Sequence, residues 1–344
     1  MAGLFMMAAL LCWLRGSAIS EGDGPRHRRV LLYTLFLLFA LAGCLCKENT
    51  VSLALLVPVL DLVLSGKGTG CWLWDRWKVP VAGVLALTAA ALFYAPLGPG
   101  FLQGYELRDF TLWERLLTQP RVVLWYITIW EYPATHLLSL EHHVPVSSGI
   151  FSPPSTALAL AALLVITIAS ICYVKKEPLI CGGWLWFVAG LLIESSFLPL
   201  EIAFEHRLYV PGLGLFLVAA GLFARLEIKR SAVPFLVLVL VSFSVLSFAR
   251  NRVWQSKEKL WKDAVQKAPE RSRPFANLCA AKYRQNELKK ARRWCRAALS
   301  RRPDNGRALL TLGLVYRVSG ELDTAKEVME RALEVRPSEG LIHY

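Results

Sequence analysis

The sequence predicts an all-α protein in which a bundle of transmembrane helices precedes a short solenoid of helical repeats. The first observation is hydrophobicity: 55% of the 344 residues are apolar and the mean hydropathy is +0.43, too high for one soluble globule. The second is charge, because the chain from Arg250 onward holds 22 Lys and Arg against 11 Asp and Glu. The third is a 34-residue repeat in that basic tail. We therefore expect a transmembrane bundle over residues 1–249 and a repeat domain over residues 250–344.

About eight or nine apolar runs of near-membrane-spanning length divide the first 249 residues. They are Met1–Leu14, Val30–Cys46, Thr50–Leu64, Val79–Ala95, Val122–Leu140, Thr156–Val174, Trp184–Leu198, Leu208–Ala224 and Val233–Phe248. The first has no basic residue before it, which is typical of the second half of a membrane helix rather than of a signal peptide. Residues 122–140 hold Glu131, Pro133 and His136, so we expect a re-entrant or broken segment there. Residues 96–121 are polar and aromatic and indicate a loop with a short interfacial helix.

Basic loops predict the topology. The loops at 26–29, 67–78, 175–176 and 225–230 carry Lys and Arg and are expected in the cytoplasm. Counting crossings from these loops makes the hairpins 30–64 and 184–224 point outward, which places the stretch from Glu194 to Gly212 and the repeats on the outer side. The basic flank that begins at Arg250 favours the opposite side, but large domains translocate largely regardless of such charge.

The eight cysteines predict neither a metal site nor a disulfide framework. Cys44 and Cys46 are two residues apart, which is not the spacing of a Cys-x-x-Cys motif. Cys279 and Cys295 either pair in an oxidising compartment or pack as small apolar side chains, and we favour packing.

The stretch from Glu194 to Gly212 is unusually polar for its place between two apolar runs. Glu194, Glu201 and Glu205 would share one face of a continuous helix, but Pro199 predicts a break. Ionisable groups at a membrane boundary are costly. We therefore favour a binding site or an ion-pair network over a solvated loop.

A second set of polar residues lies at the ends of apolar runs. Lys47 and Glu48 mark either an outer hairpin tip or a polar cavity, and we favour a cavity that also holds Glu141 and His142. No metal is expected, because the spacing of His142 and His143 after a carboxylate does not suit one.

The tail repeats with a period of 34 residues, which is typical of the tetratricopeptide helix-turn-helix unit. The pattern predicts a half repeat over 254–269 and full repeats over 272–305 and 306–339. The expected packing residues are Leu278, Ala291, Ala298, Pro303, Leu312, Gly313, Tyr316, Ala325, Ala332 and Pro337. A basic cluster at 289–302 suits acidic partners or anionic lipid headgroups, although a solvated helix face is the favoured interpretation. Nucleic acid is not an expected partner.

The run LLTQPRVVLWYITIWEYPATHLLSLEHHVPVSSGIFSPPSTALAL and the string ESSFLPLEIAFEHRLYVPG, ahead of such repeats, resemble bacterial relatives of the transmembrane and tetratricopeptide-repeat O-mannosyltransferases. The resemblance implies a GT-C glycosyltransferase fold in the bacterial inner membrane, with the repeats on the periplasmic side. It also implies transfer of a mannose-like sugar from a polyprenyl-phosphate carrier to protein hydroxyls, without a divalent metal. The pair Lys47-Glu48 matches a Lys-Glu pair of that family.

The resemblance also implies roles for particular residues. Glu205, His206, Arg207 and Tyr209 would lie at the donor phosphate, with Glu194 and Glu201 in support. The acidic loop that supplies the catalytic base in such enzymes is not found before Val30, so we expect a chain that begins late and leave the base unassigned. The alternative is a non-catalytic membrane scaffold whose repeats bind a partner protein, or an inactive fragment.

Overall fold

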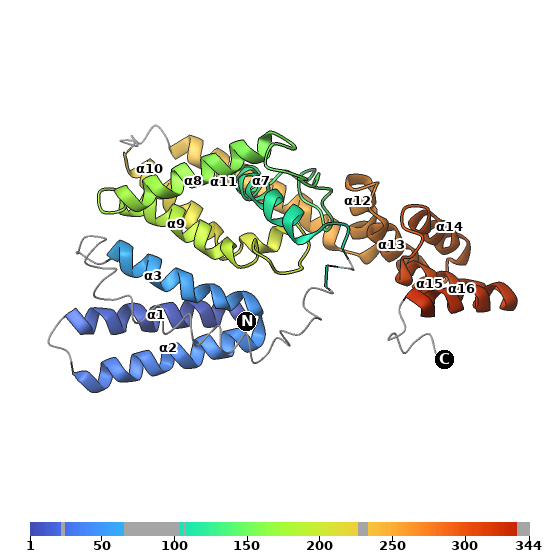
Figure 1. Ribbon diagram of the computed structural model, residues 1–344, viewed down its shortest axis with the longest axis horizontal. Helices are drawn as coiled ribbons and strands as arrows, with labels where there is room; N and C mark the ends of the chain where they lie inside the picture. The colour runs from blue at the N-terminus through green and yellow to red at the C-terminus, as the bar shows by residue number, and fades with distance from the viewer. Residues whose placement is uncertain (22–24, 65–103, 106–107, 226–232, 336–344) are drawn as a thin grey trace. The chain divides into compact units, whose positions relative to one another are not determined.

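The computed structural model describes residues 1–21, 25–64, 104–105, 108–225 and 233–335. Within these ranges the chain forms thirteen α-helices and two short 3-10 helices, and no strand (Figure 1). The predicted all-α class is confirmed. The predicted span Val79–Ala95, the basic loop 67–78 and Pro337 lie outside the described residues.

The chain divides into two compact units, each interrupted in sequence. The bundle unit comprises residues 1–130, 145–202 and 206–231. The tail unit comprises residues 131–144, 203–205 and 232–344. Two short segments from the middle of the chain therefore belong to the same unit as the basic tail.

Apolar contacts and closely approaching glycines join helices of the bundle unit. The core brings Trp13 and Leu56 together with Trp186. A Cβ atom on Gly183 would lie 2.5 Å from the carbonyl oxygen of Gly214, so small residues let α9 and α10 approach closely. The helices are α1 (Ala2–Glu21), α2 (Arg26–Cys46), α3 (Leu53–Leu64, after the 3-10 helix Glu48–Ser52), α7 (Leu112–Glu131), α8 (Ser155–Tyr173), α9 (Pro178–Leu192) and α10 (Gly212–Arg225).

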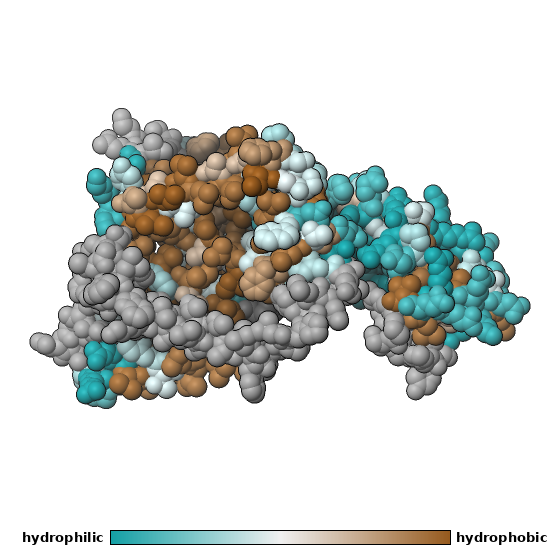
Figure 2. Space-filling model, viewed as in Figure 1, coloured by the Kyte–Doolittle hydropathy of each residue, from teal (hydrophilic) through white to brown (hydrophobic). Residues whose placement is uncertain are grey.

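Three of the described helices are long and apolar enough to cross a membrane. They are α2, α8 and α11 (Val233–Trp254), with mean hydropathies of 2.1, 2.3 and 2.1. They match the predicted runs 30–46, 156–174 and 233–248, and few of their side chains are buried within the protein. Helices α3, α9 and α10 and the apolar part of α1 are shorter. Figure 2 shows apolar side chains over much of the visible face of the bundle unit, whereas helices α12–α16 are largely hydrophilic.

Helix α7 differs from the element that the sequence predicted. It begins at Leu112, inside the expected loop, because Thr111 and Glu114 cap its first turn. The Thr111 N–H and hydroxyl donate to the Glu114 carboxylate at 2.7 and 2.9 Å, and the Glu114 N–H returns a bond to the hydroxyl. The helix then ends at Glu131, two residues before Pro133, which accords with the break expected in the run 122–140.

The tail unit contains two helix-turn-helix pairs with the same turn geometry. Asn286 and Gly320, 34 residues apart, have φ of 59° and 82°. Each is followed by a glutamate whose N–H bonds to the carbonyl five residues earlier. The helices after α11 are α12 (Lys257–Lys267), α13 (Ser272–Arg284), α14 (Leu288–Leu299), α15 (Gly306–Val318) and α16 (Leu322–Val335).

Most of the expected repeat-packing residues are buried. They are Leu278, Ala291, Ala298, Leu312, Tyr316, Ala325 and Ala332. Gly313 lies under Met329, where a Cβ atom would come within 2.6 Å of the methionine Cγ. Pro303 is exposed in the turn that follows α14.

A disulfide joins Cys279 of α13 to Cys295 of α14, with 5.2 Å between their Cα atoms. The sequence-based preference for simple packing at these two positions was therefore wrong. The equivalent positions in the next helix pair are Gly313 and Met329, so the same place in the repeat is filled once by a covalent bond and once by apolar contact.

Candidate functional site

The predicted site string forms an irregular loop rather than a helix. Helix α9 ends at Leu192, and no regular structure follows until the 3-10 helix Glu205–Leu208. Glu194 and Glu201 therefore do not share a helical face, in keeping with the break expected from Pro199. We call residues 193–202 the site loop.

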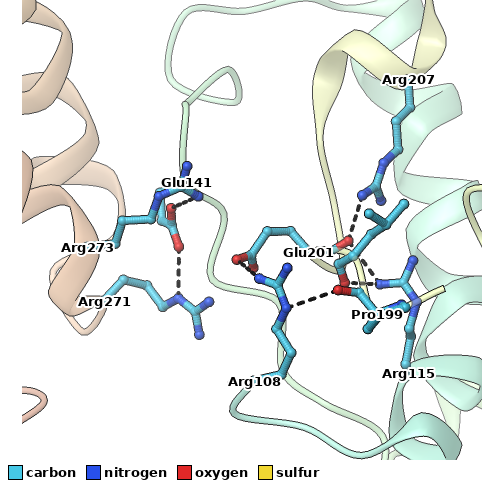
Figure 3. Close-up of polar contacts among 9 residues, drawn as sticks. Arg108, Arg115, Glu141, Pro199, Glu201, Arg207, Arg271 and Arg273 are labelled. Carbon is cyan, nitrogen blue, oxygen red and sulfur yellow. Dashed lines mark hydrogen bonds and ion pairs between the residues drawn. The ribbon is translucent and has the colours of Figure 1, made fainter. Parts of the chain in front are cut away.

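Arg115 of α7 holds the site loop together (Figure 3). The side chain is fully buried and donates to the carbonyl oxygens of Glu194 at 2.6 Å and of Ser196 at 3.0 Å. It also donates to the carbonyls of Leu200 and Glu201. One guanidinium thus satisfies four carbonyl groups that no helix or strand ladder could satisfy.

The charge of Arg115 persists despite its burial. Desolvation lowers the pKa of the guanidinium to about 10, and the nearby positive charge of Arg207 contributes to the same shift. The group is therefore still protonated at neutral pH, and its hydrogen bonds are charge-assisted.

Arg207 and Glu194 form the second fastening of the loop. The Arg207 Nε lies 3.4 Å from a carboxylate oxygen of Glu194, and both side chains are more than nine-tenths buried. Arg207 also donates to the carbonyls of Glu201 and Ile202, at 2.8 and 3.2 Å. Lys47, from the turn after α2, lies 3.9 Å from Glu194 and is about one-third exposed.

Arg108 also binds the site loop. Its guanidinium pairs with the Glu201 carboxylate and donates to the Pro199 carbonyl at 3.1 Å (Figure 3). The Tyr105 hydroxyl donates to the Phe197 carbonyl at 2.7 Å. An open cleft of about 540 Å³ lies beside these residues, lined by Tyr105, residues 108–112 and Glu114.

In the tail unit, a buried carboxylate fastens the segment 131–144. Glu141 is 4% exposed and accepts from Arg271 at 3.1 Å and from Arg273 at 3.2 Å, at the start of α13 (Figure 3). Lys267, at the end of α12, donates to the carbonyls of Thr135 and Leu138 at 2.5 and 2.7 Å. This non-helical segment is therefore anchored on the first repeat helices.

Glu205 belongs to the same tail-unit network. Its carboxylate accepts from the Ser139 N–H and lies 3.1 Å from the His142 Nε2. Arg250, near the end of α11, lies 4.0 Å from Glu205 and donates to Asp263 at 2.9 Å. The chain thus commits Glu205 to holding segment 131–144 in this unit.

The predicted site residues fall into two separate polar networks. Glu194, Glu201 and Arg207 share one network with Lys47, whereas Glu141, His142 and Glu205 share another. His206 is exposed, and Tyr209 is 79% exposed. The Glu48 side chain lies outside the described part of the structure, so the proposed four-residue polar cavity is not traced in full.

Two arginines of the site were missed by the sequence analysis. Arg115 and Arg108 lie about 80–95 positions before the loop that they bind, and most of their partners are backbone carbonyls. Backbone acceptors leave no signature in a sequence. The sequence shows only an arginine ahead of an apolar run, which resembles an ordinary charge at a helix end.

Among the described residues, no group of three or more His, Cys, Asp or Glu side chains is arranged to hold a metal ion. No protein-family model matches the chain, and no curated protein matches it.

Proposed function

We propose that the protein is an integral membrane glycosyltransferase of the GT-C type. It transfers a mannose-like sugar from a polyprenyl-phosphate carrier to protein hydroxyls on the outer face of the bacterial inner membrane. The string Glu194–Tyr209, which carries the resemblance to the O-mannosyltransferases, supports this. The observation that carries the proposal is Arg115, because a fully buried guanidinium fixes the shape of that loop. Fixed polar geometry is what a site needs to position substrates.

The burial of each side chain refines the proposed roles. Arg207 and Glu194 bind each other and hold the loop in shape. The cations that remain partly exposed on it are Lys47 and Arg108, which would contact the donor phosphate, as both residue types do in other proteins. His206 and Tyr209 are the exposed groups of the family string. The catalytic base stays unassigned.

We further propose that helices α12–α16 are tetratricopeptide repeats on the periplasmic side that bind the acceptor or another partner protein. Their 34-residue spacing and shared turn geometry support the first part. The Cys279–Cys295 disulfide supports the periplasmic location, since disulfides persist in oxidising compartments. In cells, alkylation before and after reduction should therefore find these two thiols oxidised. Free thiols at both positions in intact cells would contradict the periplasmic location.

Sugar transfer can be tested with the full chain in proteoliposomes that contain polyprenyl-phosphate mannose and a Ser/Thr-rich acceptor peptide. We expect transfer by the wild type and at least a tenfold loss in Tyr209→Ala and in Lys47→Met. Tyr173→Ala, which changes another exposed tyrosine at the end of α8, is the control and should keep full transfer. Equal transfer by all variants would contradict the site assignment. No transfer by the wild type would contradict the proposed activity.

A non-catalytic membrane scaffold is the second candidate. The observation that favours it is that Arg115, Arg207 and Glu194 direct their polar groups at the protein itself. A scaffold would show no transfer in the same assay, and a partner would still co-purify through the repeat helices.

A further inference from the structure

Three exposed positions of α14 have the opposite charge at the equivalent positions of α16, whereas Arg292 and its equivalent Lys326 are both basic. Residues 34 apart correspond, and three exposed pairs reverse in sign between the two helices. They are Lys289 and Asp323, Arg293 and Glu327, and Arg296 and Glu330. The buried faces of the same helices instead keep the same small residues, Ala291 with Ala325 and Ala298 with Ala332.

Each of these helices places like charges four positions apart on its exposed face. Helix α14 has five basic residues and no acidic residue, so Lys289 and Arg293 are like charges four positions apart. Asp323 and Glu327 repeat this arrangement in α16 with the opposite sign. Like charges at this spacing destabilise a helix. In the part of the chain that the structure describes, none of these four side chains forms an ion pair. The third pair of positions does have partners: Arg296 bonds to Tyr316, and Glu330 lies 4.0 Å from Lys326.

We propose that these faces bind a second copy of this chain. A two-fold axis that runs parallel to the two helices, between them, would place α14 of each copy against α16 of the other. Lys289 would then face Asp323 of the partner subunit, and Arg293 would face Glu327 of the partner subunit. The same surface serves both copies, so the contact is self-complementary and closed.

Charge complementarity selects this occupant over the others. An acidic protein or an anionic lipid surface matches α14 but repels α16. A basic partner does the reverse. A second copy offers an opposite charge to the three reversed positions of each helix in one contact. Single exposed ion pairs contribute little, but confinement to one membrane raises the effective concentration of the two copies. The contact should weaken as salt rises, because the charges are exposed.

Charge reversal gives a test with an internal rescue. Full-length chains with two different tags are reconstituted in bilayers at low salt, and self-association is measured by energy transfer and co-purification. The variants are K289E/R293E, which makes both faces acidic, D323K/E327K, which makes both basic, and the combination of all four changes. We expect each double variant to associate with itself at least tenfold more weakly than the wild type. The fourfold variant should recover wild-type association, and the two double variants should associate with each other.

The control is K289R/R293K, which conserves charge and should associate as the wild type does. Helix content by circular dichroism checks that each variant is folded. Association that is unchanged in both double variants, or not recovered in the fourfold variant, would overturn the proposal. Absence of wild-type association would overturn it too. Sugar transfer does not enter this measurement, so the outcome is independent of the proposed activity.

Discussion

Two non-helical segments of this protein each follow a helix and are held in part by a buried charged side chain, but these two side chains have opposite charge. In the bundle unit, the guanidinium of Arg115 binds four backbone carbonyls of the site loop. In the tail unit, the carboxylate of Glu141 binds two arginine side chains of α13. The partners differ as much as the charges do: backbone in one case, side chains in the other.

The difference follows from the chemistry of the two groups. A guanidinium has five donors in a rigid plane, so one side chain can satisfy several carbonyls and fix the path of the backbone. A carboxylate only accepts, and its partners here are flexible side chains that are 26% and 48% exposed. Arg115 therefore determines the shape of a loop, whereas Glu141 attaches a loop to a neighbouring helix.

The largest expected effect is that of Arg115→Met. The change removes the guanidinium from four carbonyls in a buried place, of which that of Glu201 keeps another donor, Arg207, and we expect a loss of about 3–5 kcal/mol in unfolding free energy. Thermal unfolding of the full chain in detergent measures it. Arg115→Lys should recover only part of the loss, because an ammonium group has fewer donors.

Arg225→Met is the matched control in the same unit. That arginine pairs with Glu177 on the surface, where an ion pair contributes less than about 1 kcal/mol. If Arg115→Met were as stable as this control, the site loop would not depend on the buried guanidinium.

A smaller effect is expected for Glu141→Gln. The amide keeps one acceptor but loses the charge, and we expect a loss of about 1–3 kcal/mol because both arginines remain partly hydrated. Hydrogen exchange should show faster opening of residues 132–144, with little change in the site loop. Glu270→Gln, next to the same arginines but exposed, should leave exchange unchanged. Equal exchange in the two variants would show that Glu141 does not anchor the segment.

The sequence predicted those features that depend on local patterns. Apolar length identified the three long spans, Pro133 indicated the break after α7, and the 34-residue period located the helix pairs. The sequence also contains the capping pair Thr111 and Glu114. This pair marks the start of α7 within the expected loop, but the prediction did not use it.

The features that it did not predict depend on contacts between distant residues. Arg115 binds carbonyls about 80 positions away, and any residue type offers the same carbonyl. Cys279 and Cys295 are 16 residues apart, and only the turn at Asn286 brings their Cα atoms to 5.2 Å. The opposite charges on α14 and α16 are visible in the sequence, but their exposure required the structure.

The smallest expected effect is a loss of tail-unit stability in acid. Hydrogen bonds from Lys262 and then Lys282 lower the pKa of Glu258 in the tail unit from 4.5 to about 2. Because the folded pKa is depressed, this stabilisation is fully present above about pH 4.5 and is lost as the pH falls toward 2. Arg115 does not titrate in this range, since its pKa is about 10. Denaturant unfolding between pH 6 and pH 2 should therefore show a shallower loss of tail-unit stability in Glu258→Gln than in the wild type. An identical slope in the two proteins would contradict the depressed pKa.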